Sequence, residues 1–191
     1  MTAAKGALHS EMPEQENGLL HGFQLWVNLP AARKMDQPTY QEFAPEQIKQ
    51  ESLDDGTVIR VITGKTPNGT SGPVTGIATD ATYLDITLPA LANYSHPIPT
   101  EYNAFIYLIS GSLQLGDVEQ IAPGQMAVFA DGDGIEIRAT TDSRLLLIAG
   151  RPIGEPVSRH GPFVMNTDAE IRQAYQDFEN GLFGHLDSDN R

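Results

Sequence analysis

The apolar residues of this chain recur in short runs, and turn-forming residues separate one run from the next. Strands bounded in this way, at a spacing of roughly 8–12 residues, are typical of a β-sandwich or barrel. Ala104–Ile109 is apolar on both faces, as expected for a strand in a closed or sandwiched sheet. The predicted strands are Val58–Thr63, Thr82–Leu88, Ala104–Ser110, Gln125–Ala130, Gly134–Thr140 and Leu145–Ala149.

A different pattern precedes these strands. Residues Leu19–Leu29 are mostly apolar and carry the only tryptophan, Trp26, so they predict an extended and partly buried strand. The stretch from Pro30 to Pro45 is polar and interrupted by proline, which indicates a crossing segment or a linker. We therefore expect the denser β domain to start in the region of residues 46–58.

The helical pattern of the chain lies near its C-terminus. Thr167 and Glu170 form a capping box, in which a hydroxyl and a carboxylate satisfy free backbone N–H groups. Apolar residues then recur at helical spacing, and Gly181 and Gly184 are expected to end the helix. The apolar stripe of this helix consists of Ile171, Ala174, Tyr175, Phe178 and Leu182.

Charge and composition exclude several classes of function. The chain has 12 Lys and Arg against 25 Asp and Glu, a formal net charge of -13, and such a surface repels nucleic-acid phosphates. Its apolar runs are shorter than the roughly 20 residues that span a bilayer, and no export signal is recognisable. We expect a cytoplasmic protein that binds neither nucleic acid nor membrane. The absence of cysteine excludes disulfides and thiolate chemistry.

His9 and Glu11 are the first candidate for a functional site. On a strand, residues two apart point to the same face, so an imidazole and a carboxylate would lie side by side. Histidine and carboxylate together are common ligands of non-haem iron and similar divalent metals. Two ligands do not hold such an ion firmly, however, and a surface pair near the chain end is the alternative interpretation.

The second candidate is His96 with Glu101, and both precede the strand ending at Gly111. When the first cupin metal motif is counted back from Gly111, its Glu position falls on Ala104 and its two His positions fall on or near Pro97 and Pro99. In the second motif, the His position after Gly124 is occupied by Ala127. We therefore expect a barrel with the turn glycines of a cupin and without its ligands, and we interpret His96 as a loop residue.

Four stretches together resemble the pirin family, and the resemblance covers essentially the whole chain. Pirins are bicupins, with two β-barrel domains in one chain and a single iron-type metal in the first barrel. The four stretches are Gly6–Pro13, His21–Pro30, Arg151–Val157 and Gly161–Thr167.

The resemblance implies an all-β fold: a cupin-type double-stranded β-helix (jelly-roll) barrel with a C-terminal α-helix. Residues 46–191 would be the C-terminal cupin domain with its terminal helix, and residues 1–45 remnant strands of the N-terminal cupin and a linker. Three His and one Glu hold the metal in this family, and His9 and Glu11 would be the third and fourth ligands. The first two come from an H-x-H that this sequence does not contain. We therefore expect a chain that starts partway through the first barrel, with an incomplete site for iron or another divalent metal.

Two kinds of function follow from the resemblance. Some bacterial members resemble quercetin 2,3-dioxygenases, in which the metal supports oxygen-dependent cleavage of a flavonol. A flavonol-like small molecule is then the expected substrate, with little activity of this chain alone. Other members are co-regulators that bind transcription factors, and an acidic surface suits a protein partner with a basic face. Because half a barrel exposes strand edges and apolar surface, we also expect a homo-oligomer.

Overall fold

The computed structural model describes residues 1–9, 18, 20–117 and 119–185. Contacts between residues divide the chain into two compact units. The larger unit is Glu42–Pro152, and the smaller unit combines Met1–Gln41 with Ile153–Arg191. A grouping by contacts does not show which part folds independently, so the division into domains 1–45 and 46–191 stays a prediction.

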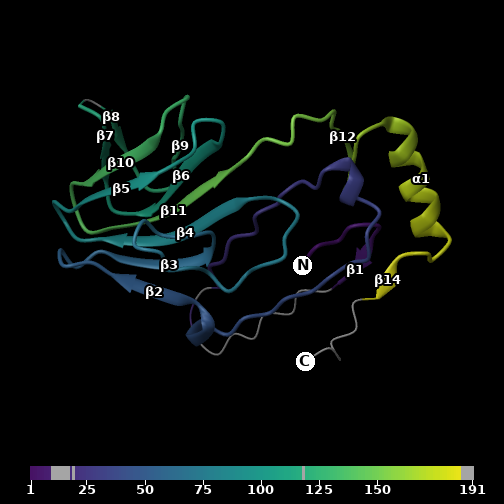
Figure 1. Ribbon diagram of the computed structural model, residues 1–191, viewed down its shortest axis with the longest axis horizontal. Coiled ribbons are helices and arrows are strands. Elements are labelled where there is room, and N and C mark those ends of the chain that lie inside the picture. Colours follow the sequence, from purple (N-terminus) through teal and green to yellow (C-terminus); the bar gives the residue numbers. More distant parts are fainter. Residues whose placement is uncertain (10–17, 19, 118, 186–191) are drawn as a thin grey trace. The chain divides into compact units, whose positions relative to one another are not determined.

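The larger unit is built from two antiparallel sheets (Figure 1). Its one short 3-10 helix within the described residues, Pro45–Gln47, leads into the first strand. The six-stranded sheet contains, in spatial order, β2 (Lys49–Ser52), β3 (Val58–Thr63), β4 (Ala81–Leu88), β11 (Ser143–Gly150), β6 (Asn103–Ser110) and β9 (Met126–Val128). The four-stranded sheet contains β5 (Asn93–Pro97), β10 (Gly134–Ala139), β7 (Leu113–Leu115) and β8 (Glu119–Ile121).

Each strand predicted between residues 58 and 149 is present, with ends that differ by at most two residues. The strands that the pattern missed are short or polar. Both β2 and β5 lie at the edge of a sheet, where one side of the strand has no neighbour and no continuous apolar run is needed. The predicted strand over Leu19–Leu29 is wrong for the described residues 20–29, which form no strand and leave Trp26 56% exposed. A strand requires a ladder partner, and none pairs with this stretch among the described residues.

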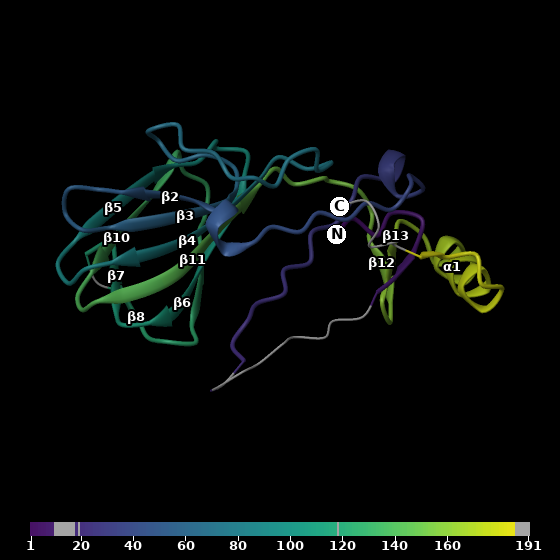
Figure 2. The ribbon, with the colours of Figure 1, turned by 90° about the horizontal axis from the view of Figure 1, so that it is seen from below.

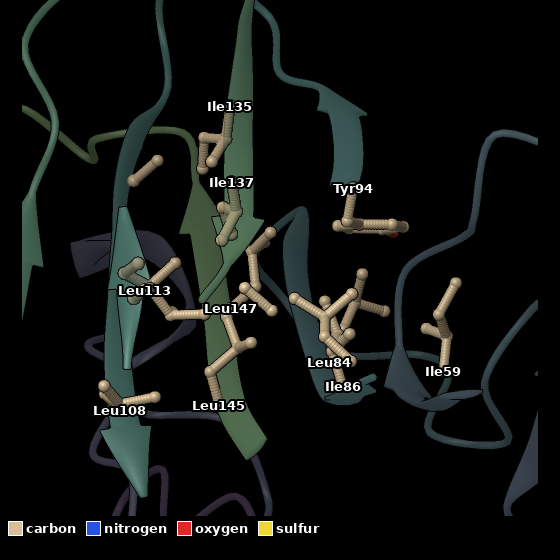
Figure 3. Close-up of a cluster of buried hydrophobic side chains, with 14 of the residues drawn as sticks. Ile59, Leu84, Ile86, Tyr94, Leu108, Leu113, Ile135, Ile137, Leu145 and Leu147 are labelled. Carbon is tan, nitrogen blue, oxygen red and sulfur yellow. The ribbon is translucent and has the colours of Figure 1, made fainter. Parts of the chain in front are cut away.

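One apolar core joins the two sheets of the larger unit. Along β6, the side chains of Ala104, Ile106 and Leu108 are buried, and they alternate with half-buried neighbours on the other face. Figure 3 shows Leu113, Ile137 and Leu147, which come from three different strands, pointing toward one another. Burial of apolar area contributes about 25 cal/mol per Å², so this shared core is the main force that closes one sheet over the other.

The smaller unit contains helix α1 (Asp168–Glu179), the hairpin of β12 (Ser158–His160) and β13 (Phe163–Met165), and the 3-10 helix Ala31–Arg33 (Figure 2). In addition, β1 (Ala7–Leu8) pairs in parallel with β14 (Gly184–His185). The hairpin packs on the helix: the ring centroid of Phe163 lies 4.7 Å from that of Tyr175 and 6.3 Å from that of Phe178.

The predicted capping box is confirmed. The backbone N–H of Glu170 donates to Thr167 Oγ1 over 3.2 Å, and the N–H of Thr167 donates to the Glu170 carboxylate over 2.8 Å. Gly181, with a φ of +68°, follows the helix end as predicted. Leu182 does not belong to the apolar stripe, because the helix has already ended and this side chain is exposed.

A buried lysine connects segments of the smaller unit that are far apart in the sequence. Lys34 is only 4% exposed, and its Nζ donates to Asn28 Oδ1 over 2.7 Å and to the backbone carbonyl of Val164 over 3.2 Å. Burial lowers the pKa of Lys34, and the negative charges of Glu155 and Glu170 partly oppose this shift. Asn166 Nδ2 donates to the Glu155 carboxylate over 2.9 Å. Asn28, Glu155 and Asn166 all come from stretches that carry the family resemblance, and these contacts give them a structural role.

Among the described residues, no helix is long and apolar enough to cross a membrane. The location in the cytoplasm stays a prediction.

The turn after β6 provides a test of the fold. Gly111 has a φ of +89°, and a Cβ there would lie 2.2 Å from Ser143 Oγ and 2.3 Å from the carbonyl oxygen of Asp142. Gly111→Ala is expected to lower the free energy of unfolding by more than 2 kcal/mol, because the clash adds to the roughly 1–2 kcal/mol of a left-handed alanine. Gly116→Ala is the matched control, since its φ is +58° with nothing within 4 Å of the added Cβ. Equal losses in denaturant unfolding would contradict this account.

Candidate functional site

The structure describes only one of the two predicted metal ligands. His9 directly follows β1, and its side chain is exposed. Glu11 lies outside the described residues, so the geometry of the pair stays a prediction. In the described ranges, no group of three or more His, Cys, Asp or Glu side chains is placed to hold a metal ion. The described residues therefore do not fit an iron-type ion with four protein ligands.

Two positions of the larger unit at which a cupin motif would carry ligands are occupied by alanine. Ala104 is buried within the apolar core, and Ala127 packs against that core. Neither methyl group offers a donor atom to a metal.

The interpretation of His96 as a loop residue is wrong. His96 lies in β5, directly opposite Ile135 of β10, and it is only 4% exposed. Tyr94, two residues earlier, points to the same inner face, and its hydroxyl lies 3.0 Å from Nδ1 of His96. The two-residue spacing of Tyr94 and His96, which puts both side chains on one face of a strand, was the signal that could have identified the pair. The short polar run between turn residues concealed it.

Burial determines the charge state of the Tyr94–His96 pair. It lowers the pKa of His96, so the imidazole is neutral at pH 7. Burial also raises the pKa of the Tyr94 hydroxyl, and the negative charge of Glu51 adds to this shift. The pair is therefore a neutral hydrogen-bonded unit, and the ring can carry its proton on either nitrogen.

His96 lines an open cleft of about 650 Å³ in the larger unit. The loop after β3 contributes Lys65 to this cleft, and the loop after β5 contributes Tyr102. The Tyr102 hydroxyl donates to the carboxylate of Asp80, and the guanidinium of Arg151 lies 5.8 Å from the centre of the Tyr102 ring. Sequence reasoning missed this cleft because its residues come from separate loops and form no motif.

The geometry first defines a class of protein. Two antiparallel sheets closed over one apolar core, with turn glycines at positive φ at Gly111 and Gly124, are a cupin-type β-barrel. Residues 83–184 match the family model of the Pirin C-terminal cupin domain. The chain therefore belongs to the pirin family. The predicted all-β jelly-roll barrel with a C-terminal helix is thereby confirmed.

Similar proteins support this assignment. The chain is 47% identical over 184 residues to a pirin-like protein of Caulobacter vibrioides, a match that covers 96% of this chain and 66% of that protein. It is 44% identical over 189 residues to human pirin, covering 96% of this chain and 64% of pirin. The chain thus spans slightly less than two thirds of the length of these curated relatives.

A solved structure is similar over much of the chain. The crystal structure of a quercetin 2,3-dioxygenase from Acinetobacter baumannii matches with a TM-score of 0.78 at 30% identity. This match covers 83% of the present chain and 55% of the dioxygenase.

The buried imidazole predicts a pH-dependent stability. An unfolded histidine, with a pKa of about 6.5, takes up a proton that folded His96 resists. The contribution of His96 to the free energy of unfolding is therefore complete above pH 6.5 and is lost as the pH falls. At pH 5.5 this loss is at most about 1.4 kcal/mol. Denaturant unfolding at pH 7.5 and pH 5.5 measures this loss, which His96→Gln should reduce. Tyr94→Phe retains the buried imidazole and should keep the loss. Identical pH profiles of the wild type and His96→Gln would contradict the prediction.

Proposed function

We propose that this chain belongs to a metal-dependent oxygenase of the quercetin 2,3-dioxygenase type and contributes His9 and Glu11 to its metal site. The observation that carries the proposal is the likeness to the solved dioxygenase, which combines sequence identity with a shared fold. Iron or another divalent metal is then the cofactor, and a flavonol-like small molecule is the substrate class.

We infer further that the chain alone has little of this activity. The family pattern needs three His and one Glu, and this sequence has no H-x-H to complete the set. The exposure of His9 also leaves its imidazole in water rather than in a shaped, water-excluding pocket. The residues of this chain therefore hold at most half of the metal site, and no catalytic step is assigned to them.

Metal analysis tests the proposed half site. The purified chain, rinsed with chelator and reloaded with Fe²⁺, is expected to retain well below one ion per chain, because two ligands bind such an ion weakly. Quercetin consumption should not exceed that of free iron at the same concentration. His9→Ala and Glu11→Ala should remove the weak binding that remains. Near-stoichiometric iron that survives the rinse would refute the incomplete site.

A second candidate function is a non-catalytic binding module that acts through protein contacts. The observation that favours it is the exposed segment, which we define as residues 20–27. Its side chains include Leu20, 61% exposed, and Val27, 51% exposed, beside the exposed Trp26. Apolar area of this kind is stabilised when another protein surface covers it. Two kinds of partner could cover the exposed segment: a second copy of this chain, or a different protein with a basic face. We propose the second copy, which makes the chain a homo-oligomer.

Sedimentation velocity tests the homo-oligomer. The wild-type chain is expected to sediment as a dimer or larger species, and Val27→Lys to shift the distribution toward the monomer, since a charge cannot be buried without a partner. Val157→Lys is the matched control, because Val157 is also an exposed valine but lies outside the exposed segment. A cleanly monomeric wild type would contradict the proposal, as would equal effects of the two substitutions.

A further inference from the structure

The cleft of the larger unit contains a polar atom without a protein partner. Two of its lining residues, Thr66 and His96, are almost completely buried. The Thr66 hydroxyl is fully used, because it donates to the Glu51 carboxylate and accepts from the backbone N–H of Thr70. Nδ1 of His96 is also used, by the Tyr94 hydroxyl. No described residue forms a hydrogen bond with Nε2 of His96, so this nitrogen is the atom that the ring offers to the cleft.

The chemistry of this nitrogen selects the polar group of a ligand. If Tyr94 donates to Nδ1, the neutral ring carries its proton on Nε2 and donates; in the other tautomer, Nε2 accepts. A ligand carbonyl suits only the first state, and an ammonium only the second. A hydroxyl can both donate and accept, so it matches Nε2 in either state. Burial keeps the imidazole neutral, which removes the attraction that a charged ring would exert on an anion.

The walls of the cleft select the rest of the ligand. Pro67, Pro97 and Pro99 line the cleft with apolar rings, and the ring of Tyr102 adds an aromatic face. This face is held from two sides, by the hydrogen bond from its hydroxyl to Asp80 and by the Arg151 guanidinium near the ring. A planar apolar body can stack on these surfaces without ordering them first.

Charge and size complete the description. The opposite charges of Lys65 and Asp80 both line the cleft, so it has no strong preference for an ion of either sign. A volume of about 650 Å³ falls in the range of small-molecule sites, about 300–1,000 Å³. We infer that this cleft binds a small neutral aromatic molecule that carries a hydroxyl group, with the hydroxyl on Nε2 of His96 and the ring on Tyr102 and the prolines. The residues that line the cleft all belong to the larger unit, and none of them is a proposed metal ligand.

Titration of the full chain with 2-naphthol tests the inference, because this probe is aromatic, neutral at pH 7 and hydroxylated. Nuclear magnetic resonance should show saturable shifts of the His96 ring nitrogens and of the Thr82 and Tyr102 amides. 2-Methylnaphthalene has a methyl group in place of the hydroxyl and can neither donate nor accept, so it should bind up to about tenfold more weakly whichever tautomer is present. His96→Phe keeps a buried ring without Nε2 and should weaken 2-naphthol binding to a similar extent.

Two further measurements keep the test decisive if His96→Phe does not fold. Tyr102→Leu changes a half-buried wall residue and should weaken binding of both probes equally, since it removes stacking and leaves Nε2 in place. The ring nitrogen shifts of wild-type His96 report contact directly. Binding outside the cleft, affinity unchanged in the folded variants, or tighter binding of 2-naphthoate than of 2-naphthol would overturn the inference. Chelator-rinsed protein is used throughout, so the result does not depend on the proposed oxygenase function.

Discussion

The larger unit depends on strand β11, which is paired along both of its sides. It runs antiparallel to β4 from the Ser143↔Leu88 pair to the Gly150↔Ala81 pair, and antiparallel to β6 on its other side. Its inward side chains enter the shared core. A one-residue slip of this strand would turn its buried residues to the opposite face and break two ladders at once. The close approach of Gly111 to Asp142 and Ser143 places the turn after β6 directly against the start of this strand.

A core of this kind decides where chemistry can occur in the larger unit. Aliphatic side chains fill the space between the sheets, and Ala104 and Ala127, at two positions where a cupin motif carries ligands, offer no donor atom. Polar side chains that are buried need partners, and the edge strand β5 supplies the Tyr94–His96 pair to satisfy one another. His96 also lines a cleft whose other residues come mostly from loops, where side chains can vary without disturbing the ladders.

The smaller unit follows a different principle. Aromatic rings of the hairpin and helix α1 pack together, and a polar network around Lys34 and Glu155 joins its remaining segments. Several residues that make the family recognisable take part in this network. The resemblance is therefore a sensitive indicator of structure, whereas the roles proposed for His9 and Glu11 stay a prediction. The sequence therefore predicted the family of this chain more securely than its function.

The sequence by itself determined the all-β class, the central strands and the capped helix. Each follows from local chemistry: apolar periodicity for the strands, and a capping box at Thr167 and Glu170 for the helix. Only the tertiary structure showed that residues 20–29 form no strand and that His96 lies in one. An apolar stretch becomes a strand only beside a partner, and residues 20–29 have none among the described residues. His96 became a buried cleft residue because β5 pairs with β10, which is distant in the sequence, and no local pattern encodes such a pairing.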